Sequence, residues 1–409
     1  MGDHGQERVK RRHALVLSGG GAFAAYEIGV LRALCAGESP GTDYVPIDPA
    51  IVTGTSAGSY NGAMFVSRWA MDPLEAIADM ERVWLTEVAP GPCGSGVFRF
   101  RASPLDWLNL SCFLESPQRF LWRRIEDVAF FTKNFVERAG AFRRSKAPIE
   151  ERFLDLLNFG NLISTYPFPG LIRRTVDFRE IRRSDVVFNA IATNWTTGEF
   201  RVFGNEDLDD TRGPLIIMAS GSIPGVFPPV DIPPHVFVDG GVLMNTPLSP
   251  TIHAGATDVH VVYLDPEVPS IPVSMFNSTL STLQRTLAIS FAGIFDRDIK
   301  DAERINQAIE RWERGAAGGG ALPTGGTGAG RIAEIWEELS QGRKLRKVTI
   351  HRYRPRGLLG GFLGMLDFKA EQTKHLIDRG YEDTVNHDCA DAGCVMPAGG
   401  PSEAPEWEE

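Results

Sequence analysis

Cysteine is scarce in this sequence, with 5 residues among 409, and no run approaches the about 18 apolar residues of a membrane-spanning helix. A small, odd number of cysteines argues against a disulfide framework and is typical of a reducing compartment. Cys389 and Cys394 lack further ligands at the usual spacing, so we expect no metal site there. Positive charge is not in excess either: the net charge of −10 excludes nucleic-acid binding by bulk charge.

The composition is otherwise that of a globular protein, with 43% hydrophobic and 23% charged residues, and this excludes wholesale disorder. The polar, basic start at residues 1–12 is followed by an apolar run that breaks at a glycine triplet, which makes a poor secretory signal. We therefore expect a protein that is cytoplasmic or peripherally associated with a membrane.

Short apolar runs alternate with helical patterns along much of the chain. Alternation of this kind predicts an α/β fold, in which a mostly parallel sheet is covered by helices on both faces, a three-layer α/β/α sandwich. Helices are expected after the first run, at 57–69 and at 71–88, the last with Asp72 as its cap. The expected strands are 13–17, 50–53, 185–192, 199–203, 236–238, 259–264 and 347–351.

We expect one large domain over 13–390, with a core at about 13–265. An aromatic and basic insertion at about 90–170 is expected to be helical, either a subdomain with solvated arginines or a cap that meets a lipid-like surface. The helix-rich part at 266–390 contains a flexible glycine-rich loop at 315–330. The apolar patch at 358–366 suits either an interfacial contact or the core, and residues 391–409 predict a disordered tail.

The pentapeptide Gly54-Thr55-Ser56-Ala57-Gly58 has the pattern G-x-S-x-G between an apolar run and a helix. In a nucleophile elbow the serine stands on a sharp turn, and the glycines Gly54 and Gly58 avoid collisions with the neighbouring strand and helix. The start of the following helix favours developing negative charge beside the hydroxyl. Ser56 is therefore a candidate nucleophile.

A glycine triplet, Gly19-Gly20-Gly21, also follows a strand and precedes a helix. Bare backbone amides at such a turn bind an anion, either a phosphate or the oxyanion of an acyl-transfer intermediate. The triplet also fits the loose dinucleotide pattern G-x-G-x-x-G/A with Ala24, but the acidic residue at the required distance, Asp43, does not follow an apolar strand. A nucleotide-binding oxidoreductase is therefore a remote alternative.

Asp239 ends an apolar run and is followed by Gly240 and Gly241. Such an aspartate is either a turn residue bonded to its own backbone or a catalytic group. No histidine lies in a loop suited to a Ser–His–Asp triad, since His253 falls in a predicted helix and His260 inside a predicted strand. A Ser–Asp dyad, with Asp239 as the base, is the better candidate.

These blocks, taken together and in this order, resemble the patatin-like phospholipases. A tail segment with Leu366-Asp367-Phe368 and another at 380–383 look like parts of bacterial members. The four blocks are 17–21 with Gly29-Val30-Leu31, 54–58, 219–224 with 227–230, and 239–241 with Asn245 and Pro247.

The resemblance implies that Ser56 is the nucleophile, Asp239 the base, and Gly19, Gly20 and Gly21 the oxyanion hole. It also implies hydrolysis of acyl esters in lipids, of the phospholipase A or lysophospholipase kind, with no cofactor and no metal. The family usually has a basic residue and then glycine where this chain has Phe23 and Ala24. This departure puts recognition of a lipid phosphate in doubt and keeps a neutral-lipid or small-ester carboxylesterase as the alternative.

Overall fold

The fold is given by a computed structural model of the chain. The structure describes residues 11–89, 167–224, 226–264, 297–311, 346–357 and 364–397, shorter stretches at 99–100, 110–118, 120–122, 124–129 and 163–164, and residues 97, 132, 289 and 359.

The central sheet is mostly parallel and confirms the expected fold class. Its strand order is β10-β9-β1-β2-β5-β8-β7, and β6 pairs with β5 off this path. The pairs among β10, β9, β1, β2 and β5 are parallel, whereas β6, β7 and β8 pair antiparallel. The strands are β1 (His13–Leu17), β2 (Pro49–Thr55), β5 (Val187–Asn194), β6 (Glu199–Phe203), β7 (Val230–Ile232), β8 (His235–Asp239), β9 (Asp258–Val262) and β10 (Thr349–Tyr353).

Alternate residues of β1 point into two different cores. Leu15 and Leu17 join the larger core, and Ala14 and Val16 the smaller one on the opposite face. The smaller core is closed by α12 (Leu248–His253) and a helix over 297–311. The larger core is closed by α1 (Ala25–Ala36), α2 (Ala57–Ser67), α3 (Pro73–Val83), α8 (Pro167–Thr175), α9 (Phe178–Arg183), α10 (Gly213–Ser220) and α16 (Ala370–Val385).

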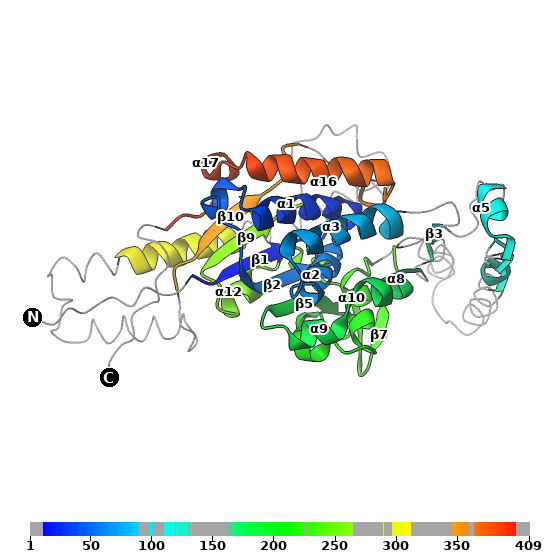
Figure 1. The fold of residues 1–409 in the computed structure, drawn as a ribbon. Helices are drawn as coiled ribbons and strands as arrows, with labels where there is room; N and C mark the ends of the chain where they lie inside the picture. Colours follow the sequence, from blue (N-terminus) through cyan, green and yellow to red (C-terminus); the bar gives the residue numbers. More distant parts are fainter. Residues whose placement is uncertain are drawn as a thin grey trace, which may run out of the picture.

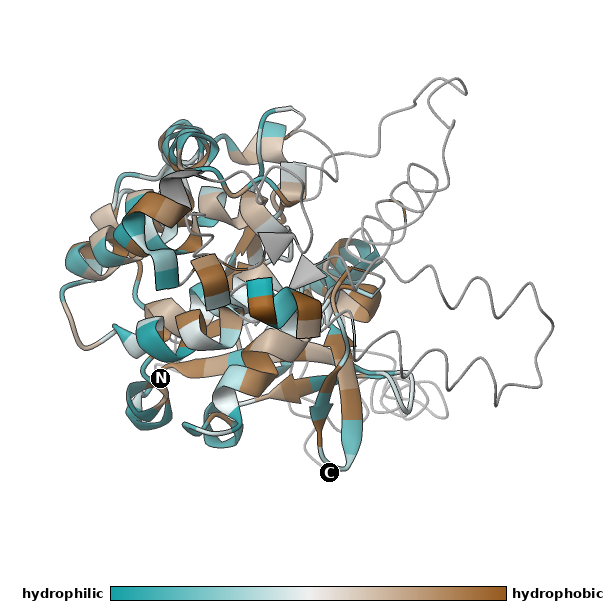
Figure 2. Cartoon of the chain, turned by 90° about the vertical axis from the view of Figure 1, so that its right-hand side faces the viewer, coloured by the Kyte–Doolittle hydropathy of each residue, from teal (hydrophilic) through white to brown (hydrophobic). Residues whose placement is uncertain are grey.

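The figures show the resulting three layers. In Figure 1, α1, α3 and α16 lie above the sheet and α12 lies below it. In Figure 2, hydrophobic colouring dominates the central strands, while the outer helices alternate between hydrophilic and hydrophobic residues. This is the pattern of a parallel sheet buried on both faces and covered by amphipathic helices.

Most expected elements are present, with bounds that differ by a few residues. The runs 13–17 and 199–203 are strands with the expected bounds, and Asp72 caps α3 by accepting hydrogen bonds from the amides of Leu74 and Glu75. In place of the single helix expected at 71–88, the α-helix α3 ends at Val83, and a π-helical segment, Trp84–Val88, follows it directly. The short edge strand β7 was not expected, because its run of prolines favours a loop.

Much of the insertion at 90–170 lies outside the described residues. Within it, β3 (Arg99–Phe100) pairs with β4 (Ile163–Ser164), and α5 (Leu110–Glu115) begins a stretch whose described residues to 129 are helical except Ser116. Trp122 and Leu114 are exposed there. The contact of this insertion with lipid stays a prediction.

The C-terminal expectations are only partly covered. The loop at 315–330 and, of the expected tail at 391–409, residues 398–409 lie outside the described residues. Residues 391–397 of that tail are described, and Val395 among them forms a β-bridge with Ile350. In the patch at 358–366, the described Leu359 is buried, and Met365 and Leu366 line a pocket discussed below. Among the described residues, no helix is both long and apolar enough to cross a membrane.

Helices α1 and α16 approach each other at glycines. A Cβ at Gly29 of α1 would collide with the backbone of Ile377 and Tyr381 in α16. We predict that Gly29→Ala lowers the free energy of unfolding by about 1–3 kcal/mol, because neither helix backbone can give way cheaply. Gly204→Ala is the matched control, since a Cβ there meets nothing within 4 Å. Chemical denaturation of both variants checks this; equal stabilities would contradict a tight α1–α16 contact.

Candidate active site

Ser56 stands on the turn between β2 and α2. Its backbone has a φ of 55° and a ψ of −126°, a conformation that serine rarely adopts. The turn requires glycine at both flanking positions. A Cβ at Gly54 would collide with the carbonyl of Gly58, and a Cβ at Gly58 would collide with the carbonyl of Leu17. The strand, the strained turn and the helix are the context that a nucleophile elbow requires.

Asp239 is brought to Ser56 by strand pairing. Thr55, at the end of β2, pairs with Ile191 of β5, and Asp239, at the end of β8, pairs with the next residue, Ala192. Because adjacent residues of one strand hold the two ends, Ser56 Oγ lies 2.7 Å from Asp239 Oδ2 and donates a hydrogen bond to it. Residues 183 positions apart in the sequence thus form a direct pair.

The carboxyl group of Asp239 is buried, with 4% of the residue exposed. Burial raises its pKa to about 7, and the hydrogen bonds from Ser56 and from the Gly241 amide oppose that rise. The Gly241 amide donates to Oδ1 at 2.7 Å, so each carboxyl oxygen has its own partner. A carboxyl group with a pKa near neutrality can accept and return a proton under physiological conditions.

Ser220, in the segment before Asp239, connects both halves of the pair. Its Oγ accepts a hydrogen bond from the Ser56 amide at 2.9 Å and donates to the Ile191 carbonyl. The following chain binds β8, since the Asp239 amide donates to the Ser222 carbonyl at 2.9 Å. The sequence pattern marks 219–224 as a block before the aspartate, but it does not reveal the positioning role of the Ser220 hydroxyl.

The glycine triplet lies beside Ser56. A Cβ at Gly19 would lie 3.0 Å from the Ser56 Cβ, so the close approach depends on glycine. The Gly19 amide donates to the Asn245 carbonyl at 3.1 Å and is therefore already engaged. Within the described part of the chain, the amides of Gly20 and Gly21 have no acceptor, so these two are the candidate oxyanion donors.

Gly21 and Phe23 fix the loop from the opposite side. Gly21 has a φ of 58°, and a Cβ there would collide with the Met365 carbonyl. Phe23 is buried, and a Cβ at Gly364 would lie 2.8 Å from its ring, so the aromatic side chain packs against the segment that carries Met365. The residue that replaces the usual basic one therefore points into the core.

The candidate site opens into an apolar pocket. Ser56 and Gly21 lie in its wall, and of the described residues that line it none is charged. Its walls come from the π-helical segment, α8, the loop after α10 and the segment before α16, so elements distant in sequence shape it together. The larger side chains in these walls include Trp84, Val88, Phe168, Phe227, Met365 and Phe368.

The histidines considered for a triad lie elsewhere. His253 Nδ1 faces Ser249 Oγ at 3.4 Å, and His260, fully buried in β9, faces the Tyr353 hydroxyl at 3.1 Å. Across the described ranges, no histidine hydrogen bonds to Ser56 or Asp239. The geometry therefore offers a two-residue arrangement for proton transfer.

Part of the sequence is similar to that of a known protein. A patatin-like phospholipase domain-containing protein of Yarrowia lipolytica is 24% identical over 206 residues, which are 46% of this chain and 23% of that relative. The chain thus spans about a quarter of the length of the curated relative it matches.

Some solved structures are also similar to this chain. VipD from Legionella pneumophila matches with a TM-score of 0.37 and 15% identity, over 92% of this chain and 66% of that one. The type III effector protein ExoU matches with a TM-score of 0.30 and 15% identity, over 92% and 52%.

The sequence profile described as "Patatin-like phospholipase" matches residues 15–252, more than half of the chain. The matched range contains the elbow at Ser56, the glycine triplet and Asp239. On this match, the chain belongs to the patatin-like phospholipase family.

Proposed function

We propose that this protein is a serine acyl-ester hydrolase that acts on lipids through a Ser56–Asp239 dyad. The observation that carries the proposal is the 2.7 Å hydrogen bond from Ser56 Oγ to a buried carboxylate, made from a strained turn. Family membership supports lipid hydrolysis in general, and the geometry supports these two residues as the groups that perform it.

In the first half of the reaction, Ser56 Oγ attacks the ester carbonyl while Asp239 Oδ2 accepts its proton. The carbonyl oxygen becomes negatively charged and faces the Gly20 and Gly21 amides, whose preformed donors stabilise it. The alcohol or lysolipid leaves with the proton from Asp239. An acyl group remains bonded to Ser56 Oγ.

In the second half, Asp239 accepts a proton from water, which attacks the acyl carbonyl. The same amides hold the second oxyanion, and Ser56 regains its proton as the fatty acid leaves. In each half the Asp239 carboxyl group acts first as a base and then as an acid. Its raised pKa suits both roles, because neither protonation state is strongly disfavoured near neutral pH.

The apolar pocket supports an acyl chain as the group that is bound. Aromatic and aliphatic walls without charge favour a hydrocarbon over a polar or nucleotide ligand. A phospholipase A or lysophospholipase-like activity is the main assignment, with no cofactor in the steps above.

A neutral-lipid or small-ester carboxylesterase is the second candidate. The specific observation in its favour is Phe23, which is buried where the family usually has a basic side chain beside the oxyanion loop. Comparing hydrolysis of phosphatidylcholine, lysophosphatidylcholine, triacylglycerol and p-nitrophenyl esters by one preparation separates the two candidates.

We predict that Ser56→Ala lowers p-nitrophenyl ester hydrolysis by about a factor of 10⁴ or more, because the nucleophile is lost. The variant should also lose labelling by a fluorophosphonate probe. Ser249→Ala and His253→Gln are the matched controls, since these residues form a Ser–His pair away from the pocket, and both should stay active. Undiminished turnover in the Ser56 variant, or loss of turnover in a folded control, would refute the dyad.

The activity should depend on pH through Asp239. Its pKa of about 7 predicts that kcat/KM falls about tenfold per pH unit well below that value, as the base becomes protonated, and levels off above it. Asp239→Asn should remove almost all activity at every pH. The measurement is a pH–rate profile with a soluble ester; an acid limb centred near pH 4 would contradict a buried base.

The stability of Asp239→Asn shows whether that loss is catalytic. A raised folded-state pKa means that the carboxyl group contributes stability at low pH, which is lost as pH rises through about 7. Asparagine does not titrate, so the variant should unfold at no lower temperature than wild type at pH 8. A lower unfolding temperature at pH 8 would attribute the lost activity to misfolding instead.

Gly21→Ala tests the oxyanion donors. The new Cβ would collide with the Met365 carbonyl and displace the Gly21 amide, so we predict a fall in kcat of about 100- to 1000-fold. Gly198→Ala is the matched control, because Gly198 also has a positive φ, 76°, but open space around it. Similar losses in both variants, measured by steady-state kinetics, would mean that backbone strain alone explains the effect.

A further inference from the structure

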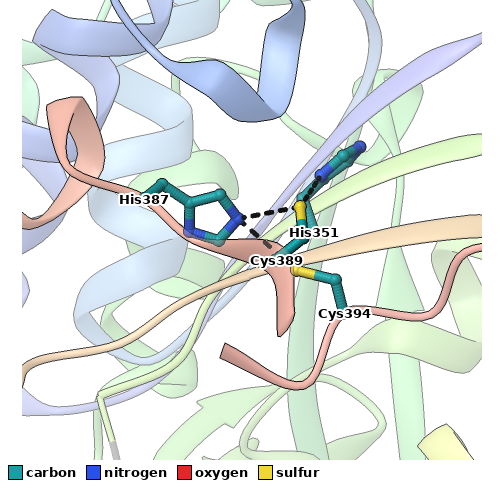
Figure 3. A group of neighbouring side chains, drawn as sticks. All are labelled: His351, His387, Cys389 and Cys394. Carbon is teal, nitrogen blue, oxygen red and sulfur yellow. Dashed lines mark hydrogen bonds between the residues drawn. The ribbon is translucent and has the colours of Figure 1, made fainter. Parts of the chain in front are cut away.

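Two histidines and two cysteines converge at the edge of the sheet opposite β7. His351 belongs to the edge strand β10, and His387, Cys389 and Cys394 belong to the segment around α17 (Cys389–Ala392), just after α16. One ligand atom from each side chain lies within 4.8 Å of the other three. Figure 3 shows the four side chains directed toward one another.

Three of the separations among the four ligand atoms match those of a tetrahedral metal site. His351 Nδ1 lies 3.5 Å from Cys389 Sγ, and His387 Nε2 lies 3.4 Å from Cys389 Sγ and 3.4 Å from Cys394 Sγ. Ligands at tetrahedral angles, with bonds of about 2.3 Å to sulfur and about 2.0 Å to nitrogen, are about 3.5 Å apart. These three separations therefore suit a metal ion bound between the four atoms, which all lie within 4.8 Å of one another.

Hydrogen bonds alone do not account for the cluster. One imidazole nitrogen offers either one N–H or one lone pair, so His387 Nε2 can make only one good hydrogen bond. It nevertheless lies equally close to both sulfur atoms. A metal ion at the centre would engage the lone pairs of all four atoms at once.

The opposite nitrogen of His351 faces a carboxylate. His351 Nε2 lies 3.7 Å from Asp258 Oδ1, a buried oxygen that forms no hydrogen bond among the described residues and lies closer to His260 Nε2, at 3.4 Å. At 3.7 Å the carboxylate does not hydrogen bond to His351, but its negative charge favours a proton on the far nitrogen, which leaves the near one free for the metal. Both histidines are also buried, with 6% and 8% of their surface exposed, so their rings are held in place.

We propose that His351, His387, Cys389 and Cys394 form a structural zinc site. Two sulfur and two nitrogen ligands in tetrahedral arrangement suit Zn²⁺, and four protein ligands leave no open position for catalysis. On binding, the two thiols each lose a proton to solvent, and the thiolates and neutral imidazoles donate their lone pairs to the metal. This site departs from the expectation of no metal that the spacing of the two cysteines suggests.

The site would fasten the segment at 387–395 to the sheet. The segment with the cysteines already joins β10 through reciprocal backbone hydrogen bonds between Ile350 and Val395, 2.9 Å each. It directly follows α16, which packs on α1, and α1 follows the glycine triplet. Zinc would thus stabilise the layer that supports the oxyanion loop, independently of the chemistry at Ser56.

The metal content of the protein tests the proposal directly. Full-length protein, purified without a metal-binding tag and with a reductant, should contain about one zinc ion per chain by mass spectrometry of the elements. Cys389→Ser and Cys394→Ser should each lose most of it, whereas the controls Cys112→Ser and His253→Gln should keep it. If both cluster variants retain the metal at the wild-type level, the assignment is overturned. The metal would then bind elsewhere, for example at His13, Asp258 and His260.

A second measurement needs only the wild type, in case the variants fail to fold. Protein stripped by a chelator under reducing conditions and loaded with Co²⁺ should show the thiolate charge-transfer band and the strong visible absorption of a tetrahedral site, both lost on addition of Zn²⁺. The stripped protein should unfold at a lower temperature, restored by Zn²⁺. The proposal would be overturned if the protein is isolated without metal and shows no cobalt spectrum after reduction. The same holds for protein that is isolated with a Cys389–Cys394 disulfide and shows no cobalt spectrum once that disulfide is reduced.

Discussion

The carboxyl group of Asp239 is buried at the end of an inner strand, and among the described residues no basic side chain pairs with it. Within the described ranges, its hydrogen-bond donors are the hydroxyl of Ser56 and the amide of Gly241. A shift of its pKa from 3.8 to about 7 corresponds to a cost on the order of 4 kcal/mol for carrying charge in that position. The pairing of β2 and β8 along one strand, β5, holds the carboxyl group in that position.

The strand β5 explains why the turn at Ser56 can stay strained. The carbonyl of Ile191 accepts from Ser220, Ser220 accepts from the Ser56 amide, and the next residue of β5 pairs with Asp239. Each contact involves backbone or a short side chain, so neither end can move without breaking several hydrogen bonds. A hydroxyl held so rigidly against a carboxylate is poised for proton transfer, which is the role proposed for this pair.

Local signals made part of this arrangement predictable. Glycines at the ends of apolar runs marked the turns that carry Ser56, the triplet and Asp239, because those turns need backbone conformations or approaches that side chains forbid. The role of Ser220 was not predictable, since a serine after a helix has no local pattern that tells which distant amide its hydroxyl will meet. The engagement of the Gly19 amide by Asn245 was hidden for the same reason.

The four residues at the sheet edge show the same limit more clearly. Cys389 and Cys394 lie within six residues, but the third and fourth ligands of the proposed site come from His387 and from His351 in β10. Ligand spacing in sequence identifies sites built on one loop, whereas this cluster depends on which strand forms the edge of the sheet. Helices α16 and α1 meet at glycines, with backbone against backbone. A displacement of α16 at that edge would therefore also displace α1, which follows the glycine triplet. The proposed metal site, none of whose four ligands lines the pocket, would hold the layer next to the glycine triplet without adding a charge to the pocket wall.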